Sequence, residues 1–266
     1  PEFDKYEKYR DKGINLARLT TEEMRVLRKD LQLIFQDPYS SLNPRLTVGQ
    51  IISEGLYAHN MFSKNDVAVQ DYILETMEKC GLASYFLHRY PHQFSGGQRQ
   101  RIGIARSVAL QPKFIVCDEA VSALDVSIQS QIINLLLDLK EEQKLTYLFI
   151  SHDLSVIKYI SDRVGVMYLG NIVELADTEE LFARPMHPYT EALLAAIPTV
   201  DSTDRKERDH YILEGDIPSP IKPPSGCKFH TRCKYATDIC KMVVPEFEEV
   251  RPGHFVACHH KLNGDK

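Results

Sequence analysis

The 266-residue sequence predicts an α/β fold in which a parallel sheet is covered by helices. Short apolar runs rich in β-branched residues recur along the chain, and stretches with a helical spacing of apolar residues separate them. The chain is long enough for one large domain or two modest ones, each with its own core. Its 43% hydrophobic and 26% charged residues are ordinary for a globular protein in water.

The expected elements follow one another in the order that such a sheet requires. Strands are expected at 31–36, 114–118, 146–151, 164–168 and 172–175, the last entered through a turn at Gly170. Helical periodicity runs through 47–90, 96–109, 128–139, 154–160, 179–182 and 189–196. A charged stretch at 201–208 and a proline-dense one at 217–224 precede a small C-terminal unit, so we expect two domains, 1–200 and 201–266.

Charge and hydropathy argue against several classes of protein. The formal net charge of −5 gives no support for a nucleic-acid binder, which usually has a basic face. No run of about 18 apolar residues occurs, so no segment is expected to span a membrane. The chain has no signal peptide and opens on Pro1 rather than Met, which suggests a fragment or a processed chain.

The segment Ser95-Gly96-Gly97-Gln98 has the composition of an anion-binding site. It precedes a predicted helix, and its two glycines leave backbone N–H groups bare where the helix dipole is positive. Successive N–H groups of this kind bind phosphate. The segment is therefore a candidate phosphate-binding site.

The strand at 114–118 ends in two carboxylates, Asp118 and Glu119. A buried strand delivers its last residues to the carboxyl edge of the sheet. There Asp118 is placed to hold Mg²⁺ through water, and Glu119 to polarise an attacking water molecule. Alone, the pair would be read as solvated carboxylates at a strand end. Its position 20 residues after Ser-Gly-Gly-Gln favours nucleotide phosphate chemistry.

In order and spacing, these two segments resemble the signature and Walker B motifs of ABC-type ATPases. Three further residues fit the same family: Gln36 matches the Q-loop glutamine, Asp125 the D-loop aspartate, and His152 the switch histidine that senses the γ-phosphate. Alone, Gln36 and His152 would be commonplace strand-end residues and Asp125 a helix N-cap. Five such elements in the family's order are hard to collect by chance.

The resemblance implies a RecA-like P-loop NTPase core of the ABC ATPase type, with an inserted helical subdomain at about 44–108. Residues 1–200 would then be an N-terminally truncated nucleotide-binding domain, and 201–266 a small Cys-rich C-terminal extension. The implied catalytic residues are Glu119, His152 and Gln36. The residues implied to contact ATP or its metal are Ser95, Gly96, Gly97, Gln98, Asp118 and Asp125, with Asp118 as the Mg²⁺ residue.

From about residue 20 onward the chain most resembles the ATP-binding subunits of oligopeptide and dipeptide importers. The segments that carry this resemblance are 37–45, 90–93, 168–174, 187–190 and the cysteine-bearing tail. It implies a peripheral subunit on the cytoplasmic face of the cell membrane that hydrolyses ATP to power peptide import. The implied partners are a second ATPase subunit, transmembrane permease subunits docked after Gln36, and indirectly a substrate-binding protein, with no nucleic acid. Nickel or sugars remain open as alternative substrates.

Two departures from the family pattern matter. Ala120 stands where the family usually has proline. More seriously, no G-x-x-x-x-G-K-[ST] sequence occurs, so the chain has no P-loop to cradle the β- and γ-phosphates. N-terminal truncation is the simplest interpretation, with a catalytically dead subunit as the alternative. A soluble ABC ATPase acting on DNA or ribosomes is a further alternative, against which the acidic balance and the importer-like segments argue.

Four cysteines, Cys227, Cys233, Cys240 and Cys258, lie within the last 40 residues. In a chain without a secretion signal such a group indicates metal ligation before disulfides. The spacings exceed those of usual zinc knuckles, and some members of the resembling family carry a cluster in this extension, so we expect [4Fe–4S] with Zn²⁺ as the alternative. Reduced cysteines packed as small hydrophobes are the competing interpretation.

Overall fold

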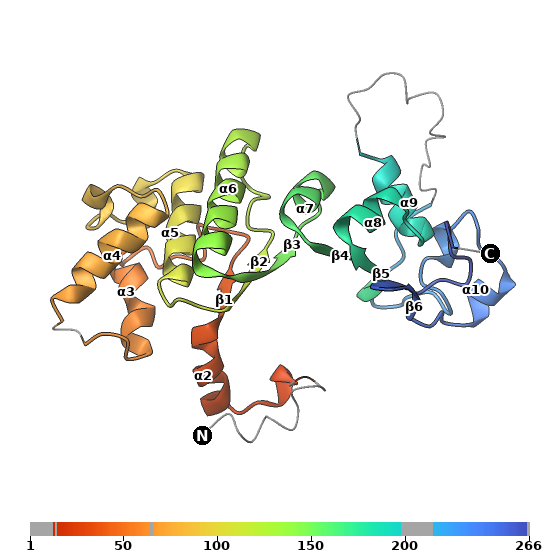
Figure 1. Ribbon diagram of the computed structural model, residues 1–266, viewed down its shortest axis with the longest axis horizontal. Helices are drawn as coiled ribbons and strands as arrows, with labels where there is room; N and C mark the ends of the chain where they lie inside the picture. Colours follow the sequence, from red (N-terminus) through yellow and green to blue (C-terminus); the bar gives the residue numbers. More distant parts are fainter. Residues whose placement is uncertain (1–12, 14, 64–65, 198–214, 265–266) are drawn as a thin grey trace. The chain divides into compact units, whose positions relative to one another are not determined.

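The computed structural model describes residues 13, 15–63, 66–197 and 215–264 (Figure 1). It divides into two compact units, Pro1–His152 and Asp153–Lys266. The domain boundary expected between residues 200 and 201, with its charged linker, lies outside the described residues and stays a prediction.

The first unit is built on three parallel strands, as predicted. They are β1 (Leu31–Ile34), β2 (Phe114–Asp118) and β3 (Thr146–Ile150), in that order across the sheet. The register pairs Leu33 with Val116, and Val116 with Leu148. Because the strands run the same way, the residues that follow each of them gather at one edge.

Apart from α4, the helices of the first unit begin at side chains that cap them. They are α2 (Thr21–Asp30), α3 (Val48–Ala58), α4 (Ala68–Lys79), α5 (Gly96–Val108) and α6 (Val126–Gln143), with short 3₁₀ turns at Leu16–Arg18, Ser84–Phe86 and Pro91–Gln93. Thr20, Thr47 and Ser95 each form a capping box with a Glu or Gln three residues on. Helices α3, α4 and α5 fall within the range expected for a helical subdomain.

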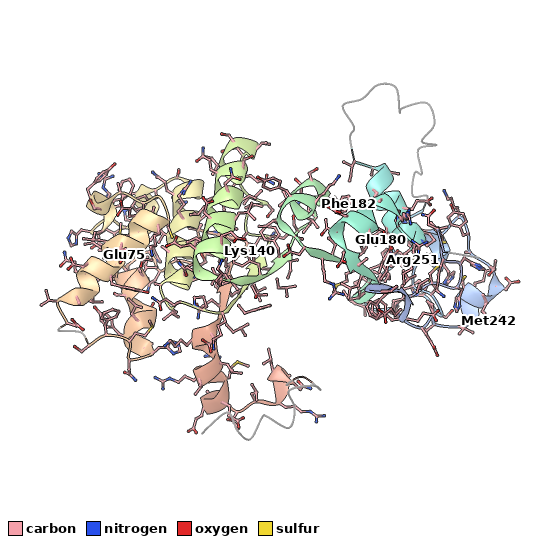
Figure 2. The ribbon with its side chains drawn as sticks, viewed as in Figure 1. Glu75, Lys140, Glu180, Phe182, Met242 and Arg251 are labelled. Atoms are coloured by element: carbon pink, nitrogen blue, oxygen red, sulfur yellow. The ribbon has the colours of Figure 1, made fainter. Side chains whose placement is uncertain are left out.

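Helices α5 and α6 are fixed to the sheet by side-chain hydrogen bonds and by apolar packing. The Ser107 hydroxyl on α5 donates to the Leu33 carbonyl at 3.3 Å, and the Tyr147 hydroxyl on β3 donates to the Leu136 carbonyl of α6 at 2.9 Å. Ile115 of β2 and Ile132 of α6 have no exposed surface. Each such side chain contributes about 1.5–3 kcal/mol by leaving water. Charged residues such as Glu75 on α4 and Lys140 on α6 are labelled in Figure 2.

The second unit contains a four-stranded antiparallel sheet. Its strands are β4 (Arg163–Tyr168), β5 (Asn171–Asp177), β6 (Glu248–Arg251) and β7 (His254–Val256), in the order β4-β5-β7-β6. Its helices are α7 (Leu154–Ile160), α8 (Thr178–Ala183), α9 (Pro188–Ala195) and α10 (Asp238–Met242), with a 3₁₀ turn at His230–Arg232. Strands β6 and β7 have no counterpart among the predicted elements.

The expectation that the strand at 164–168 continues a parallel sheet is wrong. Strands β4 and β5 form an antiparallel hairpin in which Tyr168 pairs with Asn171. The two residues between them, Leu169 and Gly170, have φ angles of +44° and +78°. Two successive residues with positive φ make the tight turn whose twist suits a hairpin.

A buried carboxylate, Glu174 of β5, ties the C-terminal hairpin to the rest of the second unit. It has no exposed surface and accepts hydrogen bonds from the backbone N–H groups of Met186 (2.6 Å) and His187 (3.0 Å). His254 of β7, 1% exposed, donates to Glu174 through Nε2 at 2.8 Å. One carboxylate thus joins three segments that are distant in sequence.

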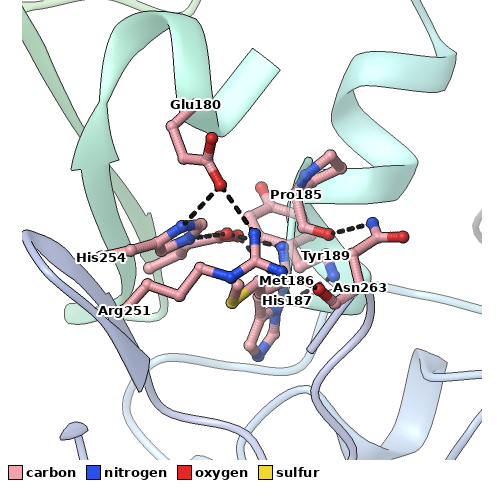
Figure 3. A network of polar contacts seen from close by, with 9 residues as sticks. Glu180, Pro185, Met186, His187, Tyr189, Arg251, His254 and Asn263 are labelled. Atoms are coloured by element: carbon pink, nitrogen blue, oxygen red, sulfur yellow. Dashed lines mark hydrogen bonds and ion pairs between the residues drawn. The ribbon is translucent and has the colours of Figure 1, made fainter. Parts of the chain in front are cut away.

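A second carboxylate extends this network toward the surface. Arg251 of β6 donates to Glu180 of α8 at 2.9 Å, and His254 Nδ1 lies 4.0 Å from the same oxygen (Figure 3). Arg251 also donates to the Asn263 carbonyl at 2.9 Å, and the Asn263 amide donates to the Pro185 carbonyl at 2.9 Å. The last described residues are therefore part of the fold of this unit.

Across the described stretches between residues 13 and 264, no helix has both the length and the apolar character that crossing a bilayer requires.

Candidate active site

Three side chains predicted from separate parts of the sequence meet at the carboxyl edge of the β1-β2-β3 sheet. Gln36 follows β1 by two residues, Glu119 follows β2 directly, and His152 follows β3 by two residues. The parallel register brings the carboxyl ends of these three strands together, since β2 lies between the other two strands (Figure 1). The sheet topology therefore positions the site.

Glu119 is the centre of this group, and its two oxygens contact different neighbours. Gln36 Nε2 donates to Oε2 at 2.6 Å, and His152 Nδ1 lies 3.3 Å from Oε1. The Glu119 side chain is 29% exposed and that of His152 is 71% exposed. The carboxylate is held in place from two sides and remains open to water.

The backbone of Glu119 is strained in a way that aims the side chain. Its φ is +45°, a left-handed conformation that residues other than glycine rarely adopt. Its N–H donates to the Ile150 carbonyl at 3.0 Å, and its own carbonyl accepts from the Ser122 N–H and hydroxyl at 3.1 and 3.0 Å. Such strain persists only where neighbours enforce it, which is typical of functional sites. The sequence pattern did not point to Ser122 in this role.

Asp118 is the last residue of β2 and is exposed. Over the described residues, no group of three or more His, Cys, Asp or Glu side chains is arranged to hold a metal ion. A single exposed carboxylate still fits Mg²⁺, which usually keeps several waters and binds through one or two carboxylates together with substrate phosphates. The Mg²⁺ assignment to Asp118 stays a prediction.

Ser95, Gly96, Gly97 and Gln98 form the start of α5. The Ser95 hydroxyl accepts from the Gln98 N–H at 3.4 Å, and the Gln98 side chain accepts from the Ser95 N–H at 3.1 Å. Ser95 and Gln98 are thus engaged with each other as a capping box. The phosphate contacts assigned to this segment are not tested by the structure.

The glycines of this segment also have a packing role that the sequence pattern did not reveal. A Cβ added to Gly97 would lie 2.4 Å from Ile128 Cγ2 of α6, far inside van der Waals contact. A Cβ on Gly96 would lie 3.6 Å from Leu124, an ordinary contact. Gly97 therefore permits the close approach of α5 and α6, whatever it does for a ligand.

Asp125 is the N-cap of α6. Its Oδ1 accepts a hydrogen bond from the Ile128 N–H at 3.0 Å. Asp125 therefore has the helix-capping role that the sequence alone indicated for it. Capping leaves the second carboxylate oxygen free for another role, so the contact with a partner subunit stays a prediction.

All six cysteines are free thiols. The pKa of Cys258 is raised to about 12, chiefly by burial and with smaller contributions from Cys227, Cys233 and Cys240. Burial likewise raises the pKa values of Cys227 and Cys233, each with a smaller contribution from neighbouring thiols of the group. The four tail cysteines are therefore close enough to affect one another electrostatically, although among the described side chains none joins a group arranged for a metal ion.

Known proteins are similar to this chain in sequence and in fold. The family model "ABC transporter" matches residues 6–122, and "Oligopeptide/dipeptide transporter, C-terminal region" matches residues 173–240. Solved structures with a similar fold include cbiO1 from Clostridium perfringens, part of an ABC transporter complex, with a TM-score of 0.55 and 27% identity over 62% of this chain and 63% of that one. A dimeric ATP-binding cassette bound to ADP and phosphate matches with the same TM-score and identity over 62% of this chain and 70% of that one.

Curated relatives are closer in sequence. The oligopeptide transport ATP-binding protein AppF of Bacillus subtilis is 53% identical over 93% of this chain and 75% of its own length. A putative peptide import ATP-binding protein of Brucella ovis is 55% identical over 92% of this chain and 76% of its length.

The fold and the site thus define an ATPase of the ABC type. The chain belongs to the ATP-binding proteins of ABC transporters, in the group that includes the oligopeptide transport proteins.

Proposed function

We propose that this chain hydrolyses ATP, as part of a complete transporter, to power the import of peptides across the cytoplasmic membrane. The observation that carries the proposal is the contact of Gln36 and His152 with the two oxygens of Glu119. The named relatives are peptide import and oligopeptide transport ATP-binding proteins, which supports peptides as the cargo.

In this proposal Glu119 accepts a hydrogen bond from the attacking water and polarises it. Gln36 and His152 hold the carboxylate so that one of its lone pairs faces the substrate. This lowers the free-energy cost of orienting the carboxylate when the reaction takes place. Asp118, together with Gln36 when ATP is bound, would hold Mg²⁺, which would supply positive charge at the transferring phosphate. His152 is exposed enough to contact the γ-phosphate directly.

The phosphate-binding surface is proposed to be shared between subunits. The 266 residues contain no P-loop sequence, so the cradle for the β- and γ-phosphates must come from elsewhere. We assign Ser95–Gln98 to the nucleotide held by a second ATPase subunit in head-to-tail pairing, and Asp125 to the contact across that pair. Both segments start helices, where the dipole favours anions.

Peripheral attachment to the membrane is proposed to occur through permease subunits. The loop after Gln36 presents Tyr39, which is 64% exposed, and Phe35, directly before Gln36, is 45% exposed. Aromatic residues are enriched at protein interfaces, so this loop is the proposed docking point. A substrate-binding protein would act only indirectly, by delivering peptide to the permease on the far side.

The tail is proposed to hold a [4Fe–4S] cluster, with Zn²⁺ as the alternative. The four thiols influence one another electrostatically, and a metal would remove their protons on binding. Iron, sulfide and zinc analysis of the anaerobically purified protein tests this. About four iron and four sulfide per chain, lost in Cys233→Ser but retained in Cys80→Ser, would support the cluster; about one zinc would support the alternative. Absence of both metals would overturn the proposal.

The functional proposal is tested by reconstituting the subunit with its permease partners and a binding protein in vesicles. We expect ATP turnover that rises on adding peptide, together with peptide accumulation. ATP turnover without vesicles and without any response to peptide would instead favour a soluble ABC ATPase.

A non-catalytic subunit is the alternative to this proposal. In that case, turnover of the assembled transporter would survive Glu119→Gln in this subunit and would be lost on the equivalent change in its partner.

A further inference from the structure

The loop that carries Gln36 is closed by one side chain of α5. Arg106 donates to the Ser41 carbonyl at 2.6 Å, and its guanidinium carbon lies 5.8 Å from the centre of the Phe35 ring. Phe35 and Ser41 are the residues on either side of the segment 36–40. The same guanidinium therefore contacts both ends of the loop.

The middle of this loop is attached to the same face of α5. Arg99, seven residues before Arg106 and so on the same helical face, lies with its guanidinium carbon 4.9 Å from the centre of the Tyr39 ring. Arg99 Nε also donates to the Pro91 carbonyl at 2.9 Å, which fixes its own position. Cation–π contacts of this kind stabilise the folded arrangement even at exposed sites.

Within the loop, Asp37 organises the backbone. Its Oδ1 accepts from the Tyr39 N–H at 2.8 Å, and its carbonyl accepts from the Ser41 N–H at 3.2 Å. The Tyr39 N–H is the main cause that lowers the pKa of Asp37, with the Ser40 hydroxyl and Arg99 acting in the same direction. The loop thus has its own turn structure, which α5 holds at its ends and its middle.

We propose that Arg106 is a positioning residue, which closes the loop 36–40 on α5 and thereby fixes Gln36 against Glu119. The role of Gln36 in turnover rests on the proposed function; the closure of the loop does not. Lysine is a poor replacement because it lacks the planar fork that stacks on Phe35 while donating to a carbonyl. Because Ser95 is the N-cap of α5, the loop and the signature segment are attached to the same helix.

A matched control is available on the same helix. Arg101 also donates to a backbone carbonyl, that of Cys80, at 3.0 Å, and to Gln131 Oε1 at 3.4 Å. It therefore anchors α5 to α4 and α6 and has no bond to the Gln36 loop. Replacing Arg101 tests whether the loss of any arginine hydrogen bond from α5 has the same effect on the loop as the loss of Arg106.

Amide hydrogen exchange of the purified chain, without nucleotide or partners, tests the closure directly. We expect Arg106→Met to raise exchange at the Tyr39 and Ser41 amides about tenfold, and Arg106→Lys to raise it less. In Arg101→Met these two amides should exchange as in the wild type. Wild-type exchange in both Arg106 variants, or an equal rise in Arg101→Met, would overturn the proposal.

The consequence for Gln36 is tested in the reconstituted transporter. Arg106→Met should lower kcat about tenfold and leave the KM for ATP within about twofold, because the loop acts at the hydrolytic water. Unchanged kcat in a variant with raised loop exchange would contradict the positioning role. If the wild-type complex shows no ATPase activity, the proposed function fails, while the exchange result still decides the loop closure.

Discussion

Gln36 and Glu119 are 83 residues apart in sequence, and their side chains meet at 2.6 Å. The contact exists because β1 and β2 are neighbouring parallel strands that end at the same edge. His152, at the end of the third strand, contacts the other oxygen of the same carboxylate. The arrangement holds the Glu119 carboxylate from two sides, as the proposed role in activating water requires.

Gly97 is predicted to be required for packing. Gly97→Ala should destabilise the first unit by about 1–3 kcal/mol, because the added Cβ overlaps Ile128 Cγ2. Gly103→Ala, on the same helix with no atom within 4 Å of the added Cβ, should stabilise it by about 0.5–1 kcal/mol. Thermal unfolding of the two variants measures the difference. Equal effects would contradict the close approach of α5 and α6, and restoration by Ile128→Ala would support it.

Acidification is predicted to destabilise the second unit through His187. Burial lowers the pKa of His187 to about 4, from an ordinary value of 6.5. Between these values the unfolded chain binds a proton that the folded histidine does not. The stability is therefore complete above about pH 6.5 and falls by up to about 3 kcal/mol as the pH drops toward 4.

His187→Asn is the matched variant for that measurement. Asparagine can accept the Tyr189 N–H as an N-cap but does not titrate. Chemical denaturation at pH 7 and pH 4.5 should show a smaller loss of stability in this variant than in the wild type. The same loss in both would mean that other groups cause the acid sensitivity.

Glu174 is predicted to hold the C-terminal hairpin in place. Glu174→Ala should cost about 3–5 kcal/mol, because it leaves the buried His254 and two backbone N–H groups without their acceptor. Hydrogen exchange at Met186 and His187 should rise in parallel. Glu174→Gln, which retains one acceptor, should lie between this variant and the wild type, and Glu179→Ala on the exposed side of α8 should have little effect. Unchanged exchange in Glu174→Gln and Glu174→Ala would refute this role.

The sequence was sufficient for the parts of the fold that depend on local pattern. The strand at 114–118 and the helix at 154–160 have the predicted bounds, since apolar runs and periodicity define them within a few residues. Gln36 and His152 were assigned through the resemblance to ABC-type ATPases, because alone each would be a commonplace strand-end residue, and the structure places both against Glu119. Their convergence follows from topology once the strand order is known.

The parts that escaped prediction depend on distant partners. Strands β6 and β7 are only four and three residues long, and they exist because β7 pairs with β5, about 80 residues earlier. The role of Arg106 cannot be predicted from the sequence, because an arginine in a helix does not indicate which carbonyl its side chain will bind. The antiparallel direction of β5 follows from the tight turn at Leu169-Gly170. Gly170 indicated a turn in the sequence, but it did not indicate that Leu169 also has a positive φ.

The most direct test of the account is ATP turnover by the assembled transporter with Glu119→Gln in this subunit. Removing the water-activating carboxylate should lower kcat at least about a hundredfold while ATP binding is kept. Glu141→Gln, at an exposed position on α6 whose carboxylate pairs with Lys144, is the control and should turn over ATP like the wild type. Wild-type turnover in Glu119→Gln would show that this carboxylate does not activate the water and would contradict the active site described above.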